Sequence, residues 1–95
     1  MELTFVESNA LGKTKAWESE FEATADFNLH IERPKGGMVY FYQKTAGTGY
    51  AHVDNVPWLS GKNEIDLDFT ALVYPKYIKV VTEVEPTLAV VTINA

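Results

Sequence analysis

The alternation of apolar and polar residues over positions 17–31 constrains the fold of this chain more than any other feature. The odd positions carry every large apolar side chain of the segment, including Phe21 and Phe27, and the even positions from 18 to 30 carry only polar or acidic residues. Residues two apart point to the same face of a strand, so the pattern predicts half-buried β-structure. Because the segment is longer than an ordinary strand, we predict two strands in line, broken at Ala23–Asp26, where small residues permit a bend or a change of sheet.

Turn residues divide the remaining chain into segments with the same alternation. Arg33–Gly37 contains one proline and two glycines, and Ala46–Gly49 is a second glycine-containing turn that predicts a hairpin. Further strands are predicted at Leu3–Val6, Met38–Thr45, Tyr50–Val53, Glu64–Phe69, Tyr77–Glu83 and Thr87–Ile93. Roughly seven or eight strands at this spacing predict one all-β domain over residues 1–95, an antiparallel β-sandwich of immunoglobulin-like or jelly-roll type. The strand list does not separate these two strand orders.

Charge and cysteine content exclude several classes of partner. The net charge is −5, and the eight lysines and arginines are scattered along the chain. Binding to nucleic acid or to an anionic membrane surface draws on clustered basic residues, so neither is an expected partner. No stretch has the roughly 20 apolar residues of a membrane span. The absence of cysteine favours folding in a reducing compartment.

The residues that could support catalysis or metal binding are few. None of the three serines lies in a nucleophile elbow. His30 and His52 lie on separate predicted strands and could meet across a sheet, but two histidines on polar faces are the favoured interpretation. Glu64, Asp66 and Asp68 alternate along one strand, about 7 Å apart, which favours a solvated outer face over a calcium site. We therefore expect a non-enzymatic protein with no catalytic residue, metal or cofactor.

Aromatic side chains are the best candidates for a binding site. Tyr40 and Tyr42 are predicted on the face opposite Val39, Tyr50 follows the adjacent turn, and Trp58 lies in a predicted loop over 54–63. Exposed aromatic rings of this kind stack on sugars or anchor protein interfaces. The plainer alternative is that Trp58 caps the core and the tyrosines pack with their hydroxyls at its rim.

The final segment, Leu88–Ile93, is uncharged and apolar on both faces. Such a strand is either central and covered on both sides, or an edge strand whose outer face is buried by another subunit. We favour the central position. Leu88 and Val90 are the candidate contact residues if the strand is instead an edge.

A pattern of strands and turns in the C-terminal two-thirds of the chain resembles a known class of protein. The pattern consists of Phe27–Ile31, a Gly-Gly turn, Val39–Lys44, Gly49-Tyr50, His52-Val53 and Tyr77–Val80. It resembles the small β-sandwich accessory proteins of tailed-bacteriophage virions, which are capsid decoration or tail proteins with immunoglobulin-like sandwiches. The resemblance implies no catalytic or metal residues.

These observations together lead to two functional hypotheses. The first is a structural protein that binds neighbouring subunits of a larger assembly, most plausibly phage capsid or tail subunits, with homo-oligomers possible. Its location would then be the virion, assembled in the host cytoplasm. The alternative is an extracellular or cell-surface carbohydrate-binding or adhesion module that uses Tyr40, Tyr42, Tyr50 and Trp58 as a stacking platform for a glycan.

Overall fold

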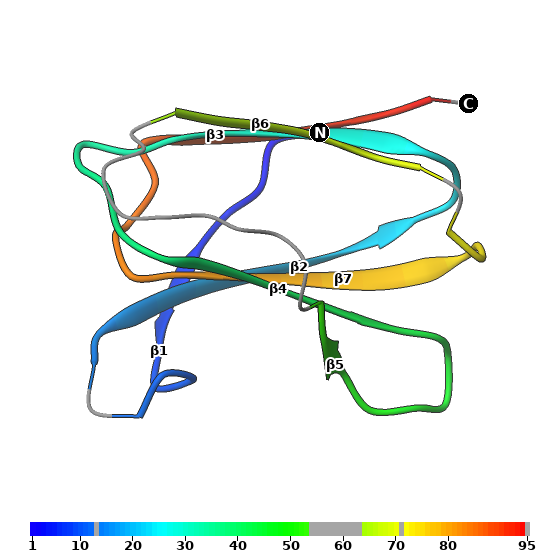
Figure 1. The fold of residues 1–95 in the computed structure, drawn as a ribbon, viewed down its shortest axis with the longest axis horizontal. Coiled ribbons are helices and arrows are strands. Elements are labelled where there is room, and N and C mark those ends of the chain that lie inside the picture. Colours follow the sequence, from blue (N-terminus) through cyan, green and yellow to red (C-terminus); the bar gives the residue numbers. More distant parts are fainter. Residues whose placement is uncertain (13, 54–63, 71, 95) are drawn as a thin grey trace.

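The described residues of the computed structural model, 1–12, 14–53, 64–70 and 72–94, form strands in two facing antiparallel sheets (Figure 1). The larger sheet has five strands in the order β1-β2-β7-β4-β5, and the smaller has three in the order β6-β3-β8. The strand bounds are β1 Val6–Ser8, β2 Ala16–Ala23, β3 Phe27–Glu32, β4 Val39–Lys44, β5 Ala51–His52, β6 Glu64–Phe69, β7 Lys76–Thr82 and β8 Leu88–Ile93. The predicted all-β sandwich is therefore confirmed.

The strand pairs are nested one inside the next. β4 pairs with β5, β3 with β6 and β2 with β7, all antiparallel. Outside them, the first residues of the chain lie along β8, with a bridge between Glu2 and Val90. Nested antiparallel pairs wrapped over two sheets give the jelly-roll strand order, so the structure selects this one of the two predicted orders.

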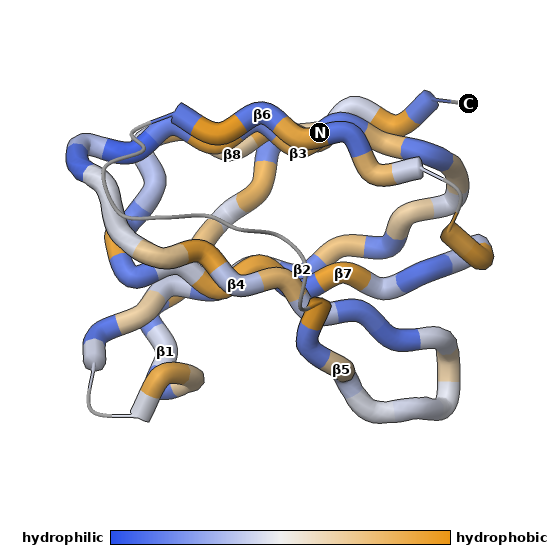
Figure 2. Tube along the Cα trace, viewed as in Figure 1, coloured by the Kyte–Doolittle hydropathy of each residue, from blue (hydrophilic) through white to orange (hydrophobic). Residues whose placement is uncertain are grey.

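The predicted break at Ala23–Asp26 is a change of sheet. β2 lies in the five-stranded sheet and β3, which follows directly, in the three-stranded sheet. The odd-numbered residues Phe21, Ala23, Phe27, Leu29 and Ile31 of these strands are buried in the core between the sheets. Figure 2 shows hydrophobic positions, in orange, along both sheets. The ring of Phe27 stacks on Phe69 at 4.7 Å and meets Phe21 edge-on at 5.2 Å. Aromatic contacts therefore join the two sheets through one core.

The favoured prediction of a central position for the last strand is wrong, because β8 lies at one edge of the three-stranded sheet. Its free side is covered by the N-terminal residues. The terminal ammonium group of Met1 donates to the carbonyl of Val91 at 2.8 Å, and the amide of Leu3 donates to the carbonyl of Ala89 at 2.9 Å. The first strand was predicted at Leu3–Val6, but the chain leaves β8 there and pairs with β2 only from Val6 onward.

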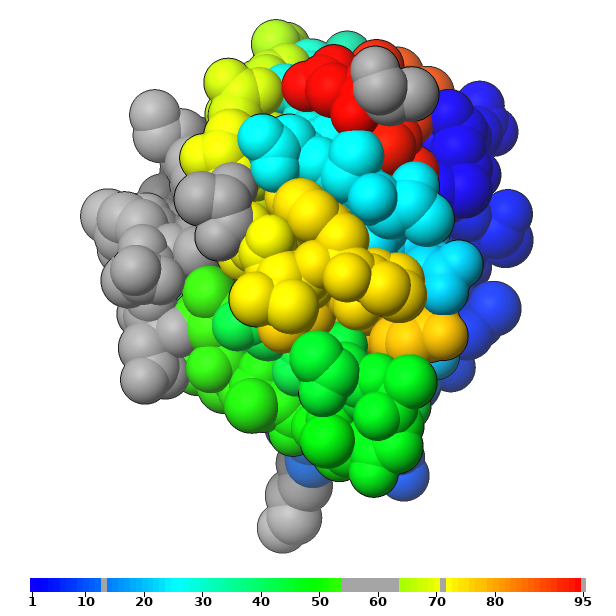
Figure 3. Space-filling model, turned by 90° about the vertical axis from the view of Figure 1, so that its right-hand side faces the viewer, coloured from blue at the N-terminus to red at the C-terminus, as the bar shows by residue number. Residues whose placement is uncertain are grey.

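Other predicted strands agree with the structure to within a few residues, and the hairpin of β4 and β5 is confirmed. β1 and β5 are the two edge strands of the five-stranded sheet, and both curl away from the three-stranded sheet (Figure 1). Figure 3 shows the β4–β5 hairpin, in green, in the half of the molecule opposite the C-terminal residues, which are red. No helix long and apolar enough to cross a membrane occurs in the described part of the chain.

Candidate functional site

The outer face of the five-stranded sheet carries a row of four side chains from four different strands. Glu20 on β2 lies opposite Lys79 on β7, Lys79 opposite Tyr42 on β4, and Tyr42 opposite His52 on β5. Directly opposed residues of antiparallel strands point to the same face, so the register brings these groups into contact range. The ring centroids of Tyr42 and His52 are 5.3 Å apart.

A second row lies beside the first, with Glu22 on β2, Tyr77 on β7 and Lys44 on β4. Lys44 and Tyr77 are partly exposed, and the ammonium group of Lys44 lies 5.8 Å from the centre of the Tyr77 ring. Each strand contributes one outward-facing group to this row: a carboxylate from β2, an aromatic ring from β7 and an ammonium group from β4. The three groups are neighbours because β7 lies between β2 and β4.

Tyr50, just before β5, joins the two rows. Its ring centre is 4.7 Å from the ammonium nitrogen of Lys44 and 4.7 Å from that of Lys79. Lys79 also lies 5.1 Å from the ring centre of Tyr42. A cation within about 6 Å of a ring centroid is attracted by the ring quadrupole, which contributes about 0.5–1 kcal/mol at an exposed site. The two lysines therefore hold three tyrosines in one cluster. We call this surface the tyrosine–lysine face, and it comprises Tyr40, Tyr42, Lys44, Tyr50, His52, Tyr77 and Lys79.

The carboxylates of β2 border the tyrosine–lysine face and affect its phenols. Burial and the neighbouring, hydrogen-bonded carboxylate of Glu20 raise the pKa of Tyr50 above its ordinary value of 10.0. A hydrogen bond to the carboxylate of Glu22 raises the pKa of Tyr77 in the same direction. A phenol donates to a carboxylate only while it is protonated, so the bond favours the neutral ring. Tyr50 and Tyr77 therefore keep neutral phenols across the physiological pH range.

The structure brings together three of the residues predicted as a binding site. Tyr40, Tyr42 and Tyr50 lie on the tyrosine–lysine face, and Tyr40 contacts His52 with ring centroids 6.0 Å apart. All three tyrosines are partly buried, so they pack on the sheet and still present ring surface to solvent. Trp58, the fourth predicted aromatic residue, lies outside the described residues.

Sequence reasoning missed Tyr77, Lys44 and Lys79 as members of this site. The alternation along the strand places Tyr77 and Lys79 on the face opposite Ile78, which is a signal for outward orientation. The sequence does not show that this strand pairs with the strand of Tyr42, because the two segments are about 35 residues apart and joined by crossovers.

Leu88 and Val90, the other two predicted contact residues, lie on the outer face of the three-stranded sheet. Leu88 is opposite Glu32 and Val90 is opposite His30, and both apolar side chains are half-buried. They therefore lie on the opposite side of the sandwich from the tyrosine–lysine face. The six predicted contact residues do not form one site.

Polar groups fill the remainder of that second outer face. The imidazole of His30 lies 2.9 Å from a carboxylate oxygen of Asp66 and 2.8 Å from one of Glu32. The amide of Asn28 donates to Asp66 at 2.6 Å and to Asp68 at 3.0 Å. We call this surface the carboxylate–histidine face, and it comprises Asn28, His30, Glu32, Glu64, Asp66 and Asp68. The acidic residues of β6 are exposed, as predicted for a solvated outer face.

The contacts of His30 change the titration of this face. Hydrogen bonds to Glu32 and then to Asp66 raise the pKa of His30 above its ordinary value of 6.5. Hydrogen bonds from Asn28 and His30 lower the pKa of Asp66 below 3.8. His30 and His52 lie on different sheets and do not meet. No group of three or more His, Asp or Glu side chains in the described residues could hold a metal ion.

Comparison with known proteins adds no relative to this description. No protein-family model, no curated protein and no solved structure matches the chain. The function is therefore inferred from the geometry of the two outer faces and from the sequence patterns.

Proposed function

We propose that this domain is a non-enzymatic structural protein that binds a neighbouring subunit of a larger assembly through the tyrosine–lysine face. The single observation that carries the proposal is the clamping of Tyr42, Tyr50 and Tyr77 by Lys44 and Lys79 on one side of the five-stranded sheet. Tyrosine contributes a large contact area with few rotatable bonds and a polar group that can find a partner.

Ordering of the rings before binding supports this role. Association has to offset the ordering of side chains at the interface, which costs about 0.5–1.5 kcal/mol for each flexible side chain. The cation–π contacts of Tyr42 and Tyr50 and the hydrogen bond of Tyr77 to Glu22 already restrict these rings. A partner that packs on these rings therefore loses little further side-chain entropy, because folding has already ordered them.

The position of the face also favours a protein partner. It lies on the outer side of the five-stranded sheet, and the edge strands β1 and β5 of that sheet curl away from the three-stranded sheet (Figure 1). Lysines and the carboxylates of β2 lie in the same cross-strand rows, so a partner can form ion pairs with both acidic and basic groups. The strand-and-turn resemblance to tailed-phage accessory proteins makes a capsid or tail subunit the partner that we propose, with assembly in the host cytoplasm.

A carbohydrate ligand is the second candidate, because the same three predicted tyrosines gather on one face. Sugar stacking needs an open ring face. Lys79 lies over Tyr42, and Tyr50 is contacted by two ammonium groups, so cations already occupy ring surface that a sugar would use. This geometry ranks a protein partner ahead of a glycan.

Lysine footprinting tests the proposal. The protein is acetylated in its native particles and, separately, as the purified domain, and each lysine is quantified by mass spectrometry. We expect Lys44 and Lys79 to react less in the particle, whereas Lys35, which is exposed in the β3–β4 turn, reacts equally in both. Equal reactivity of Lys44 and Lys79 in the two samples would contradict binding through this face.

Two further measurements separate the partner classes. Light scattering over a range of protein concentrations shows whether the neighbouring subunit is a second copy of the chain. A glycan array, run with the wild type and with Tyr42→Ala, tests the second candidate. Specific glycan binding that is lost in Tyr42→Ala would replace the protein-partner proposal, and no binding across the array would eliminate the glycan candidate.

A further inference from the structure

The edge strand β6 depends on β3 for its strand pairing. β6 lies at the end of the three-stranded sheet and, in the described part of the chain, pairs with β3 alone. On its inner side, Ile65 is buried in the core. On its outer side, β6 is attached through the contacts of the carboxylate–histidine face. Because these outer contacts join polar, partly exposed groups, a change of pH can alter them.

Three cross-strand pairs join β3 and β6 on this outer face, and they differ in charge. The pairs are Glu32 with Glu64, His30 with Asp66, and Asn28 with Asp68. Two like charges directly opposite each other destabilise a strand pair. The two opposed glutamates therefore weaken the attachment of β6, and the other two pairs have to offset this repulsion.

The imidazole of His30 contacts a carboxylate with each of its two ring nitrogens. Nδ1 lies 2.9 Å from Asp66 of β6, and Nε2 lies 2.8 Å from Glu32 of β3. An ionised carboxylate only accepts hydrogen bonds, and a neutral imidazole has hydrogen on one nitrogen only. Both contacts are therefore hydrogen bonds only in the imidazolium form. Its positive charge also reduces the repulsion between Glu32 and Glu64.

Among the described residues, the neighbouring strands offer no second cation that could replace this imidazolium. β8, on the other side of β3, adds to this face only the uncharged side chains of Leu88, Val90 and Thr92. Arg33 follows β3, but its guanidinium is buried and donates to the carbonyl of Gly37. The charge between the two strands therefore depends on His30.

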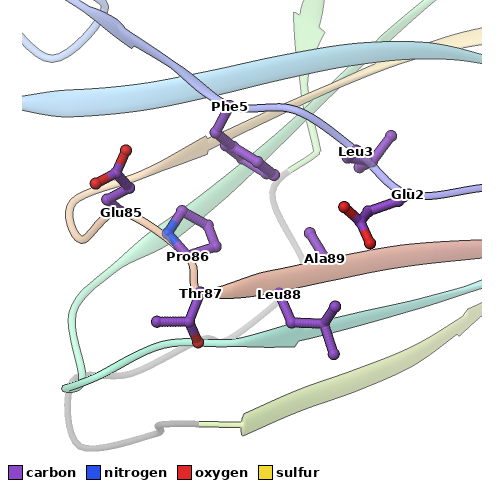
Figure 4. Close-up of a pocket in the computed structure, with 8 residues that line it drawn as sticks. All are labelled: Glu2, Leu3, Phe5, Glu85, Pro86, Thr87, Leu88 and Ala89. Carbon is purple, nitrogen blue, oxygen red and sulfur yellow. The ribbon is translucent and has the colours of Figure 1, made fainter.

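Beyond β8, the chain adds further carboxylates. Glu2 lies opposite Val90. Figure 4 shows Glu2 beside β8 and Glu85 in the turn that precedes this strand. The ammonium group of Met1 donates to the carbonyl of Val91, at the edge of β8 that faces away from β3. This cation is thus separated from His30 by the width of β8.

We propose that protonation of His30 controls how firmly the edge strand β6 is held on β3. The imidazolium joins Asp66 to Glu32 and so links the two strands. When the proton is lost, one of the two hydrogen bonds is lost with it, and the repulsion between Glu32 and Glu64 is no longer reduced. β6 then separates from β3 more often.

The direction of the pH dependence follows from the contacts of His30. Hydrogen bonds to Glu32 and then to Asp66 raise the pKa of His30 above 6.5. The link is therefore fully present at pH 6.5 and is lost as the pH rises through the raised value. No residue of the tyrosine–lysine face takes part, so the inference is independent of the proposed function.

Amide hydrogen exchange of the ¹⁵N-labelled full chain, followed by NMR from pH 6 to pH 9, tests this inference. Protection factors are corrected for the intrinsic rise of exchange with pH. Those of Ile65 and Leu67 in β6 should fall roughly two- to fivefold over this range, as expected for the loss of a partly exposed ion pair. The amide of Val53, which donates to the carbonyl of Phe41 in the other sheet, should keep its protection factor.

Three variants separate the role of His30 from that of net charge. The side-chain amide in His30→Gln has two N–H donors and does not titrate, so the protection of β6 should not change with pH. Asp66→Asn removes the carboxylate opposite His30 and should reduce the fall. Glu7→Gln removes one charge from an exposed position of β1, in the other sheet, and should behave like the wild type. The spectrum of each variant reports whether it is folded.

Three results would overturn the inference. The first is an equal fall in the wild type and in His30→Gln, or no fall in either. The second is a fall of the same size at Val53, because the change would then not be confined to β6. The third is equal protection of Ile65 and of Val80, which lies in the middle strand of the other sheet, because β6 would then open only when the whole domain unfolds.

Discussion

The two outer faces of this sandwich arise from the same alternation of apolar and polar residues in the sequence. They differ in the contacts that their outward side chains make with neighbouring strands. On the tyrosine–lysine face, long side chains from β4, from β7 and from Tyr50 just before β5 interleave, so that two ammonium groups contact three rings. On the carboxylate–histidine face, short polar groups bond to their nearest neighbours, with His30 between Asp66 and Glu32. The outward positions of β3, β6 and β8 carry no lysine or arginine.

The two faces also differ in the chemical groups that supply their positive charge. The cations that contact the rings of the tyrosine–lysine face are the ammonium groups of Lys44 and Lys79. The positive charge of the other face depends on a single imidazole, whose ordinary pKa lies within the physiological range. We therefore expect the charge of the carboxylate–histidine face to change with pH through His30.

The largest expected loss in the free energy of unfolding comes from a change in the core that supports both outer faces. Phe27→Ala deletes the ring that stacks on Phe69 and contacts Phe21, and the phenylalanine is 1% exposed. A cavity at such a site lowers the free energy of unfolding by about 3–5 kcal/mol. Urea denaturation measures the loss. Val73→Ala is the control, because Val73 is 72% exposed, and a loss in Phe27→Ala no larger than in this control would contradict a single shared core.

A smaller loss in the free energy of unfolding is expected for a substitution in the turn between β3 and β4, where the chain passes from one sheet to the other. Gly37 precedes β4 in the turn after β3, and a Cβ atom there would lie 3.0 Å from Cγ2 of Val84 and 3.6 Å from the Arg33 guanidinium. That guanidinium donates to the carbonyl of Gly37 at 2.8 Å, and Val84 is buried, so neither neighbour moves freely. Gly37→Ala should lower the free energy of unfolding by about 1–3 kcal/mol.

Gly49→Ala is the matched control for this crowding. No heavy atom lies within 4 Å of a Cβ built at Gly49. Thermal unfolding of the two variants should show a clear loss for Gly37→Ala and little change for Gly49→Ala. Similar losses in both would mean that glycine flexibility, and not contact with Val84, determines the effect.

The strands could be predicted from the sequence because alternation is a local property. The break at Ala23–Asp26 and the β4–β5 hairpin were both recognisable from small residues and turn residues. The edge position of β8 was not. An uncharged strand such as Leu88–Ile93 suggests burial on both sides, and nothing local shows that residues 1–3 cover its free edge.

The candidate site was predictable only in part, for a related reason. Tyr40 and Tyr42 share a strand, so their common face follows from their spacing. The contact of Tyr42 with Lys79 depends on β7 pairing with β4 across a jelly-roll crossover. The separation of Leu88 and Val90 from the tyrosines likewise depends on the sheet to which β8 belongs.

An effect of about 1 kcal/mol is expected for the cation at the centre of the tyrosine–lysine face. Lys79→Met keeps most of the apolar stem and removes the charge that lies over Tyr42 and Tyr50. Each such contact contributes about 0.5–1 kcal/mol at an exposed site, so the free energy of unfolding should fall by roughly 1–2 kcal/mol at most. Lys35→Met, in an exposed turn, is the control in urea denaturation. Equal values for the two variants would show that the rings do not depend on Lys79.

The smallest expected effect is a pH dependence of stability that arises from His30 and Asp66 on the carboxylate–histidine face. Because the pKa of His30 is raised by Glu32 and Asp66 in the folded protein, its contribution to stability is fully present below pH 6.5 and is lost as the pH rises through the raised value. The pKa of Asp66 is lowered, so its contribution is present above pH 3.8 and is lost as the pH falls. Both contributions are therefore present together between these two values.

Melting temperatures measured from pH 6 to pH 9 sharpen the comparison between the faces. The wild type should lose stability over this range, and His30→Gln should lose less, because the variant has no imidazolium to deprotonate. The pKa values of Tyr50 and Tyr77 are raised above 10.0, so their phenols do not titrate in this range. If His30→Gln and the wild type lose stability equally, the pH-dependent charge lies elsewhere than between Asp66 and Glu32.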